Sequence, residues 1–170
     1  MKRFGHPGQA AQRRSSGIHR RELRSTMDSG APLRFGRNDA RLGRETMNDD
    51  IKAIEAATWT YLDGLYEGDV EKLGSVFHAT SALTQSLDGE LKVVPREQWF
   101  EAVRGRKSPK ETGLERGDHV LAIDLVGPSM ALVKVKCQMP PRYFTDLLSF
   151  LKVDGKWLVA QKVFMTETAA

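Results

Sequence analysis

Three side chains in this 170-residue sequence have the types needed for acid–base chemistry: His119, Tyr61 and Asp146. A histidine changes its charge near neutral pH and can move protons, and a tyrosine hydroxyl or a carboxylate can act as its polar partner. We therefore take these residues as candidate catalytic groups for a reaction that needs no cofactor. Each of them also has a purely structural interpretation, and the sequence leaves both interpretations open.

His119 opens an apolar run in which it shares its alternation with Leu121, Ile123 and Leu125. Alternate residues of a strand face the same side of a sheet. If this side faces the interior, the imidazole ring of His119 points into a pocket. The alternative is a histidine at the rim of the domain, hydrogen-bonded to the backbone or to solvent.

Tyr61 and Asp146 each need a polar partner if they are buried. Tyr61 follows Ile54 and Thr58 at helical spacing, which predicts that it lies on the inward face of a helix. It is either a pocket residue or a core aromatic whose hydroxyl is satisfied internally. Asp146 lies in a strand with apolar residues on both faces, and Lys162 on the neighbouring strand is its candidate partner. A structural Asp–Lys pair and a pocket role both remain open.

The sequence lacks the motifs that several other kinds of chemistry require. It contains no phosphate-binding P-loop motif and no G-x-S-x-G nucleophile motif, and its four histidines have no zinc-ligand spacing. Cys137 is the single cysteine, which excludes an intrachain disulfide and a multi-cysteine zinc site. We expect no metal and no cofactor. The basic loop at 104–110 could attract an anionic ligand, although a solvated loop is the more common outcome.

The helices that would position these residues are predicted from their capping signals. Asn48–Asp50 supply N-cap chemistry for a first helix that ends near Tyr66, and Asp69 caps a second, shorter helix. Pro95 opens a third helix, which carries Trp99 and Phe100.

The strands are predicted from their alternation and from the turns between them. Asp88-Gly89 and Asp154-Gly155 are hairpin turn signals. Strands are expected at 82–87, 90–94, 119–125, 130–139, 143–153 and 157–165. This order of elements favours an α+β fold with the helices packed on one face of an antiparallel sheet.

Charge divides the chain into two parts. Residues 1–46 carry eleven basic and four acidic side chains, a net charge of +7, whereas residues 47–170 carry fifteen and eighteen, a net charge of −3. No apolar period persists in residues 1–46, so we expect a disordered basic tail or a start-site extension before Met47, followed by one domain at 47–170. An acidic domain is not expected to bind nucleic acid.

The sequence also indicates where in the cell the protein is expected. No apolar run is long enough to span a membrane, and no apolar core follows the basic N-terminus as in a secretory signal. With a single cysteine, these observations favour a cytoplasmic protein that does not bind membranes. Organelle import directed by the arginine-rich tail is the alternative.

Two runs in the domain resemble a known superfamily. The run YLDGLYEGD at 61–69, continuing to His78, resembles the first two helices of nuclear-transport-factor-2-like proteins. The runs FTDLLSFLK and DGKW near the C-terminus narrow the resemblance to the branch named putative lumazine-binding, which is related to SnoaL-like polyketide cyclases. The resemblance covers residues 47 to about 166. It implies a cystatin-like α+β cone, in which a curved antiparallel sheet wraps around helices and leaves a pocket between them.

This superfamily includes isomerases, dehydratases, epoxide hydrolases, cyclases and binding modules, so the function has to be argued from the site. We expect a pocket for a small organic ligand, lined by Tyr61, Trp99, Phe100, His119 and Leu121. The first hypothesis is a ligand-binding or accessory domain. The alternative is a cofactor-independent isomerase, dehydratase or cyclase, in which His119 works with Tyr61 or Asp146. Dehydratase and cyclase relatives often place a histidine at this strand start, which adds weight to His119.

The other face of the predicted sheet carries too much apolar surface for a lone monomer. Its apolar residues include Met130, Leu132, Leu147, Leu151 and Leu158. We therefore expect a homodimer formed through this face, as relatives commonly pair in this way. A protein-interaction role through the same face is a third functional hypothesis.

Overall fold

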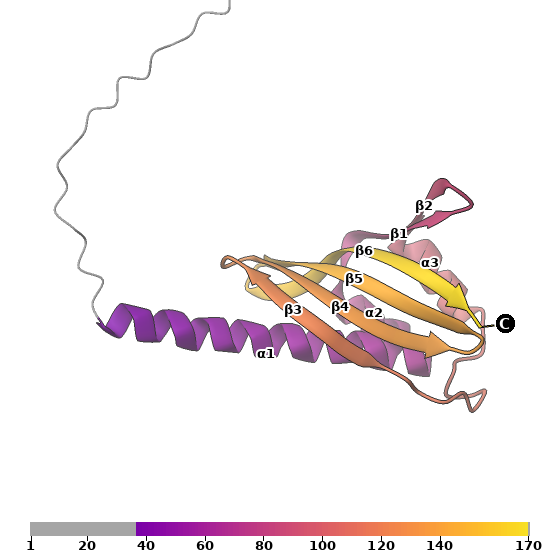
Figure 1. The fold of residues 1–170 in the computed structure, drawn as a ribbon, viewed down its shortest axis with the longest axis horizontal. Helices are drawn as coiled ribbons and strands as arrows, with labels where there is room; N and C mark the ends of the chain where they lie inside the picture. Colours follow the sequence, from indigo (N-terminus) through magenta and orange to yellow (C-terminus); the bar gives the residue numbers. More distant parts are fainter. Residues whose placement is uncertain (1–36, 170) are drawn as a thin grey trace, which may run out of the picture. The chain divides into compact units, whose positions relative to one another are not determined.

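The computed structural model describes residues 37–169, with side chains described from residue 43 onward. The elements are α1 (Arg37–Glu67), α2 (Val70–Val76), β1 (Phe77–Leu87), β2 (Glu90–Pro95), α3 (Arg96–Arg104), β3 (His119–Val126), β4 (Met130–Met139), β5 (Arg142–Val153) and β6 (Lys156–Thr168). The strands form one sheet in the order β2-β1-β6-β5-β4-β3, and α1 runs alongside it (Figure 1). The predicted α+β class and order of elements are confirmed.

Helix α1 is longer than the sequence predicted. It begins at Arg37, so the predicted start at Asn48–Asp50 is wrong. No proline interrupts residues 37–50, and potential N-cap residues do not end a helix when helix-forming residues precede them. The disordered tail was predicted for residues 1–46. Of these, residues 37–46 lie in α1, and residues 1–36 lie outside the described residues.

Asp50 ties α1 to the sheet instead of capping it. One of its carboxylate oxygens, Oδ1, accepts a hydrogen bond of 2.9 Å from Trp157 Nε1 on β6 and one of 2.6 Å from Lys152 Nζ on β5. The hydrogen bond from Lys152, followed by that from Trp157, holds the pKa of Asp50 below its usual value. These bonds stabilise the charged carboxylate, although the residue is buried.

The core lies between α1 and the inner face of the sheet. The buried face of α1 includes Ile54, Thr58, Tyr61 and Leu65, which recur at helical spacing. Alternate residues of the sheet meet this face, among them Val133, Val135, Leu148, Phe150 and Val159. The residues that alternate with them along the same strands therefore lie on the outer face of the sheet.

The predicted cap and turns are confirmed. Asp69 Oδ1 accepts hydrogen bonds from the backbone N–H groups of Glu71 and Lys72 at the start of α2. Both Asp-Gly turns have positive φ at their two central residues, 53° and 81° in the first and 49° and 78° in the second. These values fit the tight hairpin turns that Asp-Gly pairs favour.

One strand pairing departs from the predicted antiparallel sheet. Strand β1 lies parallel to β6, with Leu83 opposite Lys162, so the sheet is mixed. The chain passes through β2, α3 and three further strands before it returns beside β1, and a connection of that length allows parallel pairing. The pairing places β1, the first strand in the sequence, beside β6, the last strand. Helix α3 lies near β1.

Within residues 37–169, no helix combines the length and the apolar character needed to cross a lipid bilayer.

The contacts of Asp50 predict a large effect of its removal. We expect Asp50→Ala to lower the free energy of unfolding by about 2 kcal/mol, because Trp157 Nε1 loses its acceptor and Lys152 loses its ion pair. Because the pKa of Asp50 is lowered in the folded state, this contribution is present above about pH 4 and is lost as the pH falls through the folded-state pKa.

Urea denaturation at several pH values measures this effect. The matched control is Asp49→Ala, since Asp49 is exposed and its oxygen lies 3.9 Å from Lys52 Nζ. Equal losses for the two variants at pH 7 would contradict the anchoring role of Asp50.

Candidate functional site

A cavity of about 290 Å³ lies between α1, α3 and the inner face of the sheet. Its apolar wall consists of Leu65, Leu83, Val94, Trp99, Ala102, Cys137, Met139, Phe144 and Phe164. Its polar wall consists of Gln85, Arg106, Arg142, Lys162 and Thr166. An apolar chamber with a few polar groups is the usual form of a small-molecule site, and its size is near the lower end of the range for such sites.

Lys162 is the buried charge of this cavity, with a relative exposure of 4%. Its Nζ lies 2.9 Å from Asp146 Oδ2 and donates a hydrogen bond of 2.8 Å to the Tyr61 hydroxyl. That hydroxyl in turn donates a hydrogen bond of 2.5 Å to Asp146 Oδ2. The three residues come from β6, β5 and α1, and we call them the Lys162 cluster.

The strand register explains how the cluster forms. Asp146 lies opposite Phe164, and Lys162 lies opposite Leu148, so the two charged residues are diagonal neighbours on the inner face. Tyr61 reaches them from the buried face of α1. The predicted Asp146–Lys162 pair is therefore confirmed, and Asp146 is the partner that the Tyr61 hydroxyl required.

Burial sets the protonation of the cluster. It raises the pKa of Tyr61 well above its usual value, and the nearby carboxylate of Asp146 adds to this effect. The phenol therefore stays protonated and acts as a hydrogen-bond donor. Burial also raises the pKa of Cys137, to about 12, so its thiol stays neutral 3.9 Å from Asp146.

Lys162 is the member of the cluster that reaches the cavity wall. An ammonium group has three N–H donors, and Asp146 and Tyr61 accept two of them. The third has no hydrogen-bond acceptor among the described residues, and Nζ lies 4.7 Å from the centre of the Phe164 ring. Tyr61, predicted as a lining residue, lies behind Lys162 and is fully buried.

The orientation predicted for His119 is wrong because β3 contains a β-bulge. Val120 pairs with Val135 and Ala122 with Lys134, which leaves Leu121 as an extra residue in the strand. The prediction assumed unbroken alternation from His119 to Leu125, and a bulge shifts that alternation by one residue.

As a result, His119 lies on the outer face of the sheet. It pairs with the exposed Lys136 and is itself exposed, and Leu121 is 48% exposed. His119 borders a separate depression of about 330 Å³ on that face, together with Lys136, Gln138 and Tyr143. The sheet separates His119 from Lys162, so the two cannot act on one small ligand.

Of the two aromatic residues predicted on α3, only Trp99 lines the cavity. Phe100 is buried, and its ring packs 5.4 Å from that of Trp99 and beneath the guanidinium group of Arg96. Consecutive residues of a helix point about 100° apart, so the two rings leave α3 in different directions.

Arg106 and Arg142 also line the cavity, and the sequence analysis did not identify them. The basic character of loop 104–110 was the one available signal for Arg106. Nothing in the sequence pattern predicts that the first residue of β5, Arg142, faces the same cavity.

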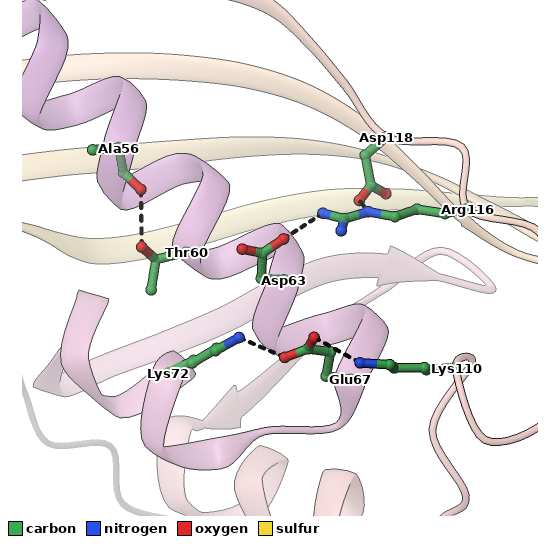
Figure 2. Close-up of polar contacts among 8 residues, drawn as sticks. All are labelled: Ala56, Thr60, Asp63, Glu67, Lys72, Lys110, Arg116 and Asp118. Carbon is green, nitrogen blue, oxygen red and sulfur yellow. Dashed lines mark hydrogen bonds and ion pairs between the residues drawn. The ribbon is translucent and has the colours of Figure 1, made fainter.

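The segment that carries Arg106 is fixed to α1 by ion pairs (Figure 2). Arg116 bonds Asp63 on α1 at 2.7 Å and Asp118 at 2.6 Å. Lys110 lies 3.1 Å from Glu67 on the same helix. The segment between α3 and β3 is therefore held against α1 at more than one point.

Among the residues with described side chains, no group of three or more histidine, cysteine, aspartate or glutamate residues is arranged to hold a metal ion.

The family described as putative lumazine-binding matches residues 49–165. The chain belongs to this family. The putative lumazine-binding domain lies within the nuclear-transport-factor-2-like superfamily, which confirms the resemblance inferred from the sequence.

The chain is 25% identical over 125 residues to a protein named aldolase FrzH from Cladobotryum sp, covering 72% of the chain and 96% of the relative. It is similar in structure to an NTF-2 like protein of unknown function from Silicibacter pomeroyi, with a TM-score of 0.63 and 20% identity over 71% of this chain and 98% of the other.

A second similar structure is a putative scytalone dehydratase from Novosphingobium aromaticivorans, with a TM-score of 0.55 and 18% identity over 75% of this chain and 92% of the other. These likenesses show the shared fold. The family match fits a ligand-binding domain.

The Lys162 cluster makes a prediction about stability. We expect Lys162→Met to lower the free energy of unfolding by about 3 kcal/mol, because it leaves the Asp146 carboxylate buried without its counter-ion. Replacing all three polar groups, in Tyr61→Phe/Asp146→Leu/Lys162→Met, is expected to restore most of this loss, since no buried charge is then unpaired.

Urea denaturation of the two variants compares them directly. A triple variant that is less stable than Lys162→Met would contradict the assignment of the loss to an unpaired buried charge.

Proposed function

We propose that this chain is a small-molecule-binding domain whose ligand occupies the cavity beside the Lys162 cluster. One observation carries the proposal: a chamber of about 290 Å³ has aromatic and aliphatic walls and the ammonium group of Lys162 at its buried end. The apolar walls suit a flat or alicyclic organic body, and the remaining N–H of Lys162 suits one oxygen of that body.

The wall of the cavity favours binding over proton-transfer catalysis. Among its described lining residues, none is a carboxylate or an imidazole. Asp146 lies behind Lys162, His119 lies on the other face of the sheet, and the Cys137 thiol has a pKa of about 12. A general base has to reach the proton that it removes, and these groups do not combine access with a suitable pKa.

Carbonyl chemistry is a second candidate function, and the Lys162 cluster is the observation that favours it. An N–H of Lys162 could polarise a ligand carbonyl and stabilise an enolate oxygen, while Tyr61 and Asp146 hold the ammonium group in place. The similarity to a protein named as an aldolase agrees with this chemistry. A base from the ligand or from water would complete the step.

One measurement separates the two candidates. The α-protons of 2-tetralone exchange with D2O when a protein enolises the ketone, and proton NMR follows the exchange. The binding function predicts no exchange beyond that in buffer, whereas carbonyl catalysis predicts faster exchange that Lys162→Met abolishes.

The binding function predicts that the cavity takes up a neutral apolar probe. We expect N-phenyl-1-naphthylamine to bind the full chain with a rise in fluorescence, and Ala102→Trp to weaken this binding at least about tenfold by filling the cavity. The control is Glu101→Trp, which adds the same indole at the neighbouring position of α3 but outside the cavity lining. Equal fluorescence from the two variants would place the probe elsewhere and contradict the proposal.

The outer face of the sheet supports the homodimer as a further part of this proposal. Its exposed apolar residues are Leu121, Met130, Leu132, Leu147, Leu151, Val163 and Met165, while Leu158 is half-buried. A contiguous apolar patch on a soluble domain favours association, and a second copy of this chain offers a matching patch. We also propose a cytoplasmic location, with partners limited to the small ligand and the second copy.

The dimer predicts a mass of twice 19.0 kDa in sedimentation equilibrium at micromolar concentration. We expect Leu147→Lys to raise the dissociation constant at least about tenfold, because it replaces an exposed apolar side chain with a second positive charge beside Lys134, which lies opposite Leu147. Leu91→Lys is the control, since Leu91 is 72% exposed but lies on β2 at the far edge of the sheet. A wild-type chain that sediments at 19.0 kDa would exclude the dimer.

A further inference from the structure

The cavity has an excess of positive charge. Arg106, Arg142 and Lys162 line it, and none of its described lining residues is acidic. Asp146 balances the charge of Lys162. Within the described part of the chain, neither guanidinium group has a hydrogen bond or an ion pair with an acceptor, although Arg142 lies 5.7 Å from the centre of the Phe144 ring.

The guanidinium group of Arg106 is partly removed from water without compensation. Its Nε is buried and has no hydrogen-bond partner among the described residues. Burial lowers the pKa of Arg106, and the positive charge of Arg142 lowers it further. A buried donor without an acceptor and a nearby like charge both cost free energy, and one anion between the two groups would relieve both costs.

The chain that follows Arg106 is anchored to α1. The backbone N–H of Lys110 donates a hydrogen bond of 3.0 Å to the Tyr66 carbonyl oxygen, and the side chain of Ser108 is buried. Further along, Arg116 is bonded to Asp63 of α1 (Figure 2). The loop therefore holds Arg106 near the cavity through contacts that do not involve its own side chain.

The two arginines lie where the cavity approaches the surface. Both also border a neighbouring surface depression, together with Pro109 and Thr112. Lys162, in contrast, is 4% exposed. The polar groups of the cavity are thus divided between an outer pair of guanidinium groups and an inner ammonium group, with apolar side chains between them.

We propose that the ligand of this cavity is an organic acid whose carboxylate is bound by Arg106 and Arg142 and whose apolar body packs on Trp99, Phe144 and Phe164. A guanidinium fork matches the two oxygens of a carboxylate, and paired forks hold it more firmly than one. The inference rests on the proposed binding function and adds the charge of the ligand to it. A free inorganic oxyanion would satisfy the arginines but would leave the apolar wall unused.

Two probes that differ in charge alone test the inference on the full chain. 2-Naphthoate and 2-naphthamide share one ring system, and isothermal titration calorimetry in low-salt Tris chloride gives the affinity of each. We expect the carboxylate to bind at least about tenfold more tightly, as charge-assisted hydrogen bonds exceed neutral ones. Arg106→Met should reduce this preference at least about fivefold, and Arg104→Met, an exposed arginine paired with Glu101, should leave it unchanged.

Thermal unfolding without ligand provides a second readout. Because Arg106 has no acceptor among the described residues, we expect Arg106→Met to unfold at the same temperature as the wild-type chain or at a higher one. A structural arginine would give the opposite result, a lower unfolding temperature, and that would overturn its assignment as a ligand-binding group.

The outcomes separate this inference from the proposed function. Binding of N-phenyl-1-naphthylamine with equal affinities for the two naphthalene probes would overturn the organic acid and leave the binding function standing. Failure of all three probes to bind would overturn both. Inorganic phosphate that binds as tightly as 2-naphthoate, or an equal loss of preference in Arg104→Met, would also overturn the assignment of an organic acid to Arg106 and Arg142.

Discussion

A single buried ammonium group, that of Lys162, constrains how α1, β5 and β6 come together. An ion shielded from water needs a counter-ion and hydrogen-bond acceptors within the protein. Asp146 provides the first from β5, and the Tyr61 hydroxyl provides a further acceptor from α1. Because Tyr61 joins this ion pair from α1, the helix cannot slide along the sheet without breaking both hydrogen bonds of the buried Tyr61 hydroxyl. Together with Asp50 near the middle of α1, this interaction fixes the position of the helix, and the cavity wall follows from that position.

The charged groups around the cavity differ in whether they have a charged partner among the described residues. Lys162 and Asp146 form an ion pair through Asp146 Oδ2, while Asp146 Oδ1 has no hydrogen-bond partner among the described residues. Arg106 and Arg142 have no such acceptor in the described chain, and their placement adds nothing evident to stability. Groups that a fold does not need for its own stability are often those that serve its ligand.

Much of the fold could be predicted from local signals, and the errors have identifiable causes. Asp69 and the two Asp-Gly turns act within a few residues, so the sequence reveals them. The Asp146–Lys162 pair was also predictable, because a carboxylate in an apolar strand requires a partner. His119 was misplaced because alternation was extended through a bulge that no residue type announces. Arg106 was missed because its position depends on contacts between a loop and α1 that are distant in sequence.

The bulge at Leu121 divides β3 into two segments. Which side chains of each segment face the interior does not depend on the alternation in the other segment. Downstream of it, Ile123 and Leu125 pack against the core, and upstream of it the face of His119 is set by the presence of one additional residue. An insertion or deletion of one residue at this point would exchange interior and exterior positions at the strand's beginning while the rest of the sheet kept its pairing. Evolution of this scaffold can therefore add a titratable group to the interior, or remove one from it, by changing the length of the chain. The titratable residue itself need not be substituted.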